Sequence, residues 1–316
     1  MKSIGGYLDF QLNKGTEYYP DLIKLNTGRN ALEYILRIKR YKLVHLPYFT
    51  CQAVLEPIKK LKLQYQFYTI DEQLDPVLDF TVRDQECLIY TNYFGLKQQT
   101  VETLGPKFNN LIIDNSQAFF SVPIEGADTF YSCRKFFGVP DGAYLQTKSP
   151  ARLKMDKDIS YGRCSHLLKS IDLGIEDGYA DFQDNNAALS KNPIRKMSSL
   201  TQRLMSSIDY KFCKFRRNSN FFYLHEHLQE YNDYVFDDAA INGPMIYPLV
   251  IKNAELRARL LENKIYVATY WPNVLEWTTK KMYEHYLTTN LVALPIDHRY
   301  NHADMKRIIN LIKNYL

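Results

Sequence analysis

The sequence of 316 residues lacks the marks of several protein classes. Its five cysteines are an odd number and include no CxxC pair, which argues against a disulfide framework or a zinc site and favours a reducing compartment. No apolar run is long enough to span a membrane, and the segment MKSIGGYLDFQL has no apolar stretch of the kind found in a signal peptide. We therefore expect a cytoplasmic protein with no membrane partner.

The sequence also lacks a long block of basic residues. The net charge of +5 is spread along the chain, which argues against a nucleic-acid partner. His225 and His227 lie two residues apart, but no further ligands surround them in the sequence, so we expect no metal site. Hydrophobic residues make up 46% of the chain and charged residues 24%, which is enough apolar material for a sizeable globular core.

Short apolar segments alternate with amphipathic ones over the first half of the chain. Residue composition and segment length predict strands at 42–48, 63–70, 86–93, 110–115, 128–133 and 142–147. Apolar residues at helical spacing predict helices at 30–40 and 51–61. This alternation is typical of a large, doubly wound, mostly parallel sheet with helices on both faces.

A second, smaller α/β pattern follows a polar and mostly helical stretch at 151–235. It predicts strands at 245–251 and 290–296 and helices at 253–264 and 301–316. Asn301 has the character of an N-cap, with Asp304 three residues later. We expect a large α/β domain at 1–210, ending in a helical linker, and a small C-terminal α/β domain at 211–316.

The segment KLNTGRNALEYIL combines a glycine-bearing turn with the start of a helix. Gly28 permits a tight turn, and the free N–H groups of the helix end suit a phosphate. Thr27 offers a hydroxyl and Arg29 a charged fork. The alternative is an ordinary N-cap beside a glycine, since the segment is neither a Walker loop nor a GxGxxG motif.

Two further segments bring an acid and an amine close in sequence. Asp114 ends the apolar run LIID, where a carboxylate could bind magnesium, a ribose or a protonated ring nitrogen, or could serve as a structural cap. Gln117 follows within one turn and could reach the same ligand. Lys135, beside Arg134 and two phenylalanines, has the surroundings of a nucleophilic amine, although a surface lysine lying over aromatic rings is the alternative.

Taken together, these three features match the needs of pyridoxal 5′-phosphate (PLP). The helix start would receive the phosphate, the carboxylate would keep the pyridine nitrogen protonated, and the lysine would hold the aldehyde as a Schiff base. The motifs TGRNAL, DNSQA and FYSCRKFFGVPDGA, together with ATYWP and LPIDHRYNHADMKRIINLI, resemble those of the fold type I PLP enzymes, specifically the DegT-type nucleotide-sugar aminotransferases. The resemblance is patchy but collinear, and it touches most of the chain.

The resemblance implies a role for each matching residue. Lys135 would be the Schiff-base lysine, Asp114 the partner of the pyridine nitrogen and Gln117 a contact on the side of the phenolic oxygen. The phosphate would be bound by residues in two segments, namely Gly28, Arg29, Asn30 and Ser132. The family further implies a homodimer that moves an amino group, with glutamate as the expected donor, to a keto group of a nucleotide-linked sugar for polysaccharide or related glycan biosynthesis.

Two positions depart from the family pattern. Phe130 stands where many members carry a phosphate-binding serine, and we expect Ser132 or Arg29 to compensate. Cys51 stands where a ring usually stacks on the cofactor, which leaves Tyr48, Phe49 and Tyr93 as candidates, and we place Trp271 in the cleft. The alternatives are a non-catalytic member that binds a sugar nucleotide or a partner, or a PLP enzyme of another reaction type, such as a dehydratase or an amino-acid transaminase.

Overall fold

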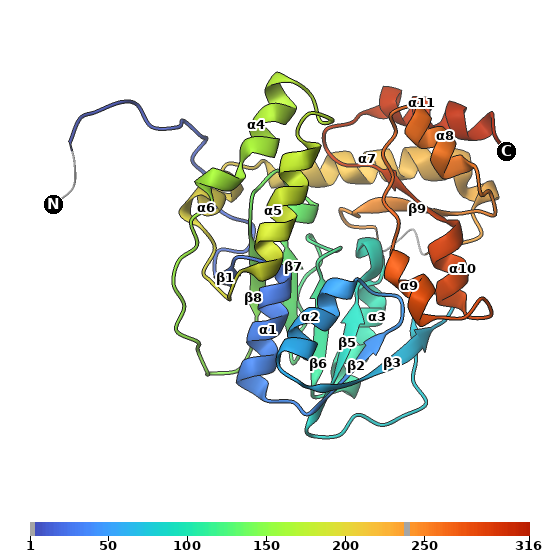
Figure 1. Ribbon diagram of the computed structural model, residues 1–316. Coiled ribbons are helices and arrows are strands. Elements are labelled where there is room, and N and C mark those ends of the chain that lie inside the picture. Colours follow the sequence, from blue (N-terminus) through green and yellow to red (C-terminus); the bar gives the residue numbers. More distant parts are fainter. Residues whose placement is uncertain (1–3, 237–240) are drawn as a thin grey trace.

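The computed structural model describes residues 4–236 and 241–316, and it is built around an eight-stranded sheet (Figure 1). The strand order across the sheet is β1-β8-β7-β6-β5-β2-β3-β4. The strands are β1 Ile23–Leu25, β2 Leu43–Pro47, β3 Gln64–Ile70, β4 Pro76–Val77, β5 Glu86–Thr91, β6 Leu111–Asn115, β7 Asp128–Ser132 and β8 Ala143–Gln146. All six strands predicted from the sequence are present, and the two that were missed, β1 and β4, are very short.

The central strands of the sheet are parallel. β7, β6, β5, β2 and β3 pair in parallel, whereas β8, β1 and β4 join antiparallel. The carboxyl ends of the parallel strands therefore share one edge, where open α/β sheets bind their ligands. Asp114 on β6 lies beside Thr91 on β5 and Phe130 on β7 at this edge.

Both faces of the sheet are covered, because neighbouring residues of one strand point to opposite sides. Ile112 packs with Leu32 of α1 in one apolar cluster, and Ile113 packs with Phe119 in the other. The helices of this part are α1 Gly28–Lys39, α2 Leu55–Lys60, α3 Gln98–Leu104, α4 Ser165–Asp172, α5 Tyr179–Lys191 and α6 Ser199–Met205. The predicted doubly wound, mostly parallel α/β class is confirmed.

The C-terminal part contains a second small sheet, in which β9 and β10 pair antiparallel. Its elements are α7 Tyr210–Leu228, β9 Ile246–Val250, α8 Leu256–Glu262, α9 Pro272–Trp277, α10 Tyr283–Asn290, β10 Leu291–Pro295 and α11 His302–Lys313. Asn301 caps α11 in a capping box with Asp304, as the sequence predicts. One apolar cluster runs from the large sheet into this part, so the boundary at residue 210 stays a proposal. In the described parts of the chain, we find no helix with the length and apolar character of a membrane span.

Candidate active site

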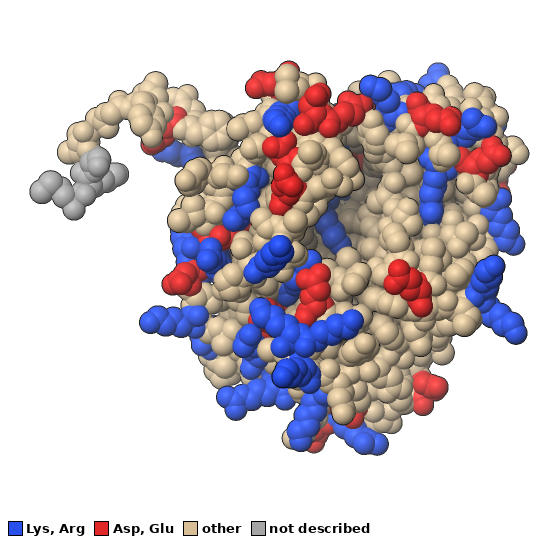
Figure 2. All heavy atoms as spheres, in the orientation of Figure 1, with Lys and Arg blue, Asp and Glu red and all other residues tan. Residues whose placement is uncertain are grey.

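A cavity of about 200 Å³ lies at the carboxyl edge of the parallel strands. Figure 2 shows this face of the molecule hollowed between α5 and α9. The cavity is lined by Gly28, Arg29, Leu32, Thr50, Cys51, Ala53, Val54, Thr91, Asp114, Ser116, Gln117, Phe130, Ser132, Arg134, Lys135 and Trp271. Among these are six residues that the sequence singled out for cofactor chemistry, namely Gly28, Arg29, Asp114, Gln117, Ser132 and Lys135. Their functional roles remain a proposal.

The carboxylate of Asp114 is held at the end of β6 by the turn that follows. It is 5% exposed, and its Oδ1 accepts hydrogen bonds from Ser116 N at 2.8 Å and Ser116 Oγ at 2.5 Å. Within the described chain no hydrogen bond reaches Oδ2. Asp114 is therefore oriented by one oxygen while the other remains able to accept from a ligand.

Lys135 lies close to this carboxylate, at the end of the short 3₁₀ turn Cys133–Lys135 that follows β7. Its Nζ donates to Ser116 Oγ at 3.4 Å, so the Ser116 hydroxyl connects the amine to Asp114. Sequence reasoning did not identify Ser116. Its position between the acid and the glutamine of DNSQA was the available signal, but the link depends on the turn geometry.

Gln117 has a half-satisfied side chain. It is 1% exposed, its Oε1 accepts from Phe94 N at 3.0 Å, and its Nε2 is buried with no partner in the described chain. An unpaired buried amide donor is costly unless a ligand satisfies it. Because Gln117 lines the cavity, this donor is available to an acceptor bound there.

The opposite part of the cavity is formed by the start of α1. Thr27 caps the helix by accepting from Asn30 N at 3.1 Å, and Gly28 and Arg29 line the cavity. A Cβ at Gly28 would lie 3.8 Å from the Phe130 ring and from Ser132 Cβ, which is an ordinary contact, so crowding alone does not require glycine there. Arg29 Nε lies 2.5 Å from Glu56 Oε2 in an ion pair.

Asn30 does not line the cavity, and the expected phosphate contact stays a prediction. Its backbone N–H serves the Thr27 cap, and its Nδ2 donates to Asn26 Oδ1 and to Pro193 O, each at 2.9 Å. These bonds turn the side chain towards the segment after α5. We therefore assign Asn30 to holding that segment against α1.

The three aromatic candidates for stacking lie outside the cavity wall. Tyr48 stacks on Phe67 at 4.7 Å, whereas Phe49 and Tyr93 are fully buried, and Tyr93 Oη donates to Phe49 O at 2.9 Å. Trp271 does line the cavity, and its ring lies 4.9 Å from that of Phe49. The C-terminal part of the chain thus contributes Trp271 to the wall of the cavity, and the large sheet domain contributes Phe130 and Cys51.

Arg134 is a further cavity residue, which the sequence presented only as a neighbour of Lys135. Its Nη2 donates to Asn186 Oδ1 at 2.6 Å, and its guanidinium lies 5.8 Å from the ring centre of Phe182, both on α5. Its Nε is buried with no hydrogen-bond partner. Burial lowers the pKa of Arg134 to about 10, so it is still a cation at neutral pH.

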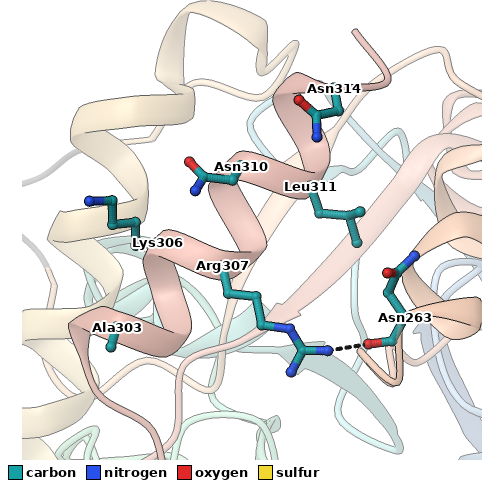
Figure 3. Close-up of a pocket in the computed structure, with 7 residues that line it drawn as sticks. All are labelled: Asn263, Ala303, Lys306, Arg307, Asn310, Leu311 and Asn314. Carbon is teal, nitrogen blue, oxygen red and sulfur yellow. Dashed lines mark hydrogen bonds between the residues drawn. The ribbon is translucent and has the colours of Figure 1, made fainter.

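A second hollow, of about 400 Å³, lies on the surface of the C-terminal part and differs in chemistry (Figure 3). Its polar lining comes from asparagine amides and from two cations, Lys306 and Arg307, of which Arg307 donates to Asn263 O at 2.5 Å. No carboxylate is among its lining residues in the described chain. Across residues 4–236 and 241–316, no cluster of three or more His, Cys, Asp or Glu suits a metal ion.

Comparison with known proteins finds no matching protein-family model and no matching curated sequence. Solved structures do match. A DegT DnrJ EryC1 StrS aminotransferase from Brucella abortus is 16% identical, with a TM-score of 0.63 over 93% of this chain and 85% of that chain. DesI, solved in the presence of its TDP-sugar product, is 15% identical, with a TM-score of 0.65 over 92% of this chain and 79% of that chain. Spr1654 from Streptococcus pneumoniae, in a PLP form, is 13% identical, with a TM-score of 0.61 over 94% and 88%.

These likenesses decide the architecture. The chain has the fold of the type I PLP transferases. The fold implied by the sequence resemblance is confirmed. Asp114 near the end of β6 and Lys135 in the turn after the neighbouring parallel strand β7 line one cavity. At such low sequence identity the likeness concerns the fold, and the chemistry has to be argued from the site itself.

Proposed function

We propose that this protein is a PLP-dependent aminotransferase. The observation that carries the proposal is the hydrogen-bonded series from Asp114 through the Ser116 hydroxyl to Lys135. The same cavity is lined by the N-terminus of α1 with Arg29, and by Arg134. The unpaired Nε2 of Gln117 fits the same ligand, since a buried donor needs an acceptor. An acid, an amine and a phosphate-binding turn in one cavity are what PLP chemistry requires.

Each residue would perform a defined task. PLP, when bound, supplies an electron sink for reactions at an amino-bearing carbon. Lys135 Nζ would bind the aldehyde carbon and afterwards carry the proton that moves during amino transfer. Asp114 would keep the ring nitrogen protonated, and Gln117 Nε2 would donate to the phenolic oxygen. Trp271 and Phe130 would shield the ring from water.

The proposed substrates are an amino-acid donor, with glutamate as the expected one, and a keto sugar linked to a nucleotide. The support is the motif resemblance together with the fold shared with DesI, which was solved with a TDP-sugar product. The role would be in surface polysaccharide or related glycan biosynthesis. We further propose a cytoplasmic location, which five unpaired cysteines support.

We also propose a homodimer. An apolar surface extends along the segment that contains α4 and the start of α5, with these exposed side chains: Ile159, Tyr161, Leu168, Ile171, Leu173, Ile175, Tyr179 and Phe182. The N-terminal segment projects from the body of the molecule (Figure 1) and exposes Ile4, Tyr7, Leu8 and Phe10. Large exposed apolar patches mark contact surfaces. Sedimentation should give twice the chain mass of 37.2 kDa, and a monomer at micromolar concentration would contradict the dimer.

The decisive test of the proposed function is covalent trapping. Purified protein is incubated with PLP, reduced with borohydride and digested, and the peptide masses are measured. We expect the reduced cofactor on the peptide that contains Lys135, and none in Lys135→Arg, which keeps the charge but cannot form the bond. Wild-type protein that carries no cofactor mass would overturn the enzyme assignment and favour a non-catalytic binding protein.

A further inference from the structure

We propose that Arg134 is a phosphate-binding residue of this cavity, acting with Arg29, Ser132 and the first turn of α1 in place of the hydroxyl that Phe130 lacks. The ligand group is a phosphate monoester. This inference rests on the proposed function for the identity of the whole ligand, but the phosphate contact can be tested separately.

The first argument is charge balance. Arg29 and Arg134 both line the cavity, and Arg29 is neutralised by Glu56 at 2.5 Å. In the described chain, no carboxylate lies within ion-pair distance of Arg134. Asp141 favours its charged form from farther away, but the Asp141 carboxylate itself accepts hydrogen bonds from Ser198 and Thr201. A partly buried cation without an anion is costly, because the lost hydration is not replaced. A dianionic ligand in the cavity would supply the missing charge.

The second argument is geometry. Asn186 and Phe182 hold the guanidinium of Arg134 from one side, through one hydrogen bond and one ring contact. These contacts fix the side chain without using its Nε–H, which remains buried and unpaired. An oriented donor binds an anion with little further loss of side-chain freedom, and a guanidinium matches the spacing of phosphate oxygens.

The third argument is what surrounds the start of α1. The first turn of a helix offers N–H groups to an anion, and Gly28 lies there beside the Phe130 ring and Ser132. A phenyl ring cannot donate a hydrogen bond to phosphate. Side-chain donors next to this turn are therefore those of Ser132 and the two arginines, which line the same cavity. Arg134 is the arginine whose charge is not already paired.

A purely structural role for Arg134 is the competing interpretation. The bond to Asn186 connects the turn of Lys135 to α5, and its loss could loosen that turn. The two roles differ in what they do to ligands. A phosphate contact affects only phosphorylated ligands, whereas a loosened turn affects every ligand that reaches Lys135.

The experiment measures dissociation constants of PLP and of pyridoxal, which lacks the phosphate, in wild type, Arg134→Gln and Arg134→Lys. Arg163→Gln is the matched control. It removes a neighbouring positive charge that does not line the cavity, and it leaves Asp158 paired with Arg195. Folding of each variant is checked by thermal unfolding. Inorganic phosphate is titrated against the same four proteins by calorimetry.

We expect Arg134→Gln to weaken PLP about 10- to 100-fold, the range of one charge-assisted contact, and to change pyridoxal by less than about threefold. Arg134→Lys should recover part of the loss, and Arg163→Gln should bind both ligands like wild type. Equal weakening of PLP and pyridoxal, or no weakening of PLP, would overturn the inference.

A wild-type protein that fails to bind PLP at all would defeat the proposed function instead. The phosphate titration then decides the inference by itself. Saturable binding of inorganic phosphate that is lost in Arg134→Gln supports it, and equal binding by both proteins contradicts it.

Discussion

Arg134 lies within the Lys135 turn and Arg217 donates to the carbonyl of Phe136 just after it, but the surroundings of these two arginines differ. Arg217 on α7 is 1% exposed, and its guanidinium donates to Pro244 O, Met245 O and Phe136 O at 3.0 to 3.4 Å. It also lies 4.5 Å from the ring centre of Phe136. Arg134 makes one side-chain hydrogen bond and lines a cavity. Burial lowers the pKa of both guanidinium groups to about 10.

An unpaired donor does not by itself indicate a ligand site. The Nε of Arg217 also lacks a hydrogen-bond partner, but it is enclosed by protein. A carboxylate favours the charged form of each arginine, Asp297 for Arg217 and Asp141 for Arg134. The Nε of Arg134 differs because its side chain borders a space that a ligand could enter. Arg217 therefore stabilises the fold, whereas Arg134 is available for binding.

The largest expected effect comes from Arg217→Met. This change keeps side-chain volume but leaves three buried carbonyl groups without their donor, so we expect a loss of about 3 kcal/mol or more in the free energy of unfolding. Urea unfolding measures it. Arg216→Met on the same helix is the control, since Arg216 lies over the Phe212 ring, and its change should stay within about 0.5 kcal/mol. Equal losses in the free energy of unfolding of the two variants would contradict a special structural role for Arg217.

A smaller effect is expected in the stabilisation of the folded protein by bound PLP. At 100 times its dissociation constant, PLP should raise the free energy of unfolding of wild type by about 2.7 kcal/mol. At the same concentration Arg134→Gln should gain only about 1 kcal/mol, because its affinity is lower. Arg217→Met should be less stable than wild type without PLP, but PLP should raise its free energy of unfolding by the same amount as in wild type. If PLP stabilised Arg134→Gln as much as wild type, Arg134 would contribute no more to PLP binding than Arg217 does.

The smallest effect concerns Glu284, a buried carboxylate outside the cavity. It is 1% exposed, its Oε1 accepts from Ile70 N at 2.8 Å, and burial raises its pKa above the usual 4.5. A raised pKa means that its contribution to stability is fully present below pH 4.5 and is lost as the pH rises through the folded value. Glu284→Gln keeps the acceptor but does not titrate.

We therefore expect the stability of Glu284→Gln relative to wild type to increase between pH 4 and pH 7, as followed by urea unfolding at each pH. A constant difference across this range would mean that Glu284 keeps an ordinary pKa in the folded protein.

Sequence patterns predicted the long central strands and the capped helix α11 because these elements depend on local periodicity and capping. The two-residue strand β4 and the polar helix α3 were not predicted, since neither is long or apolar enough to show a period. The fold class followed from the alternation of elements, and the structural comparisons confirmed it.

The candidate site was predictable where a residue type implies its chemistry, as for Asp114 and Lys135. The side-chain direction of Asn30 depends on Pro193, and that of Arg134 depends on Asn186 on α5, so neither could be read from its own segment. Trp271 lines the cavity, whereas Phe49 and Tyr93, the candidates for ring stacking that are nearer in sequence to the site residues, are buried in the core. Contacts between distant segments account for each of these differences.

The position of Trp271 has a consequence for folding. The start of α1, the Asp114 carboxylate and the Lys135 amine all lie within the first 135 residues, whereas Trp271 is added by a segment more than a hundred residues later. Because contacts between distant segments form late, the cavity is closed only after the last third of the chain has docked. A nascent chain that ends before Trp271 would have the reactive amine but not the shielded space around it. We therefore expect shielding of the Lys135 amine to depend on docking of the C-terminal part of the chain.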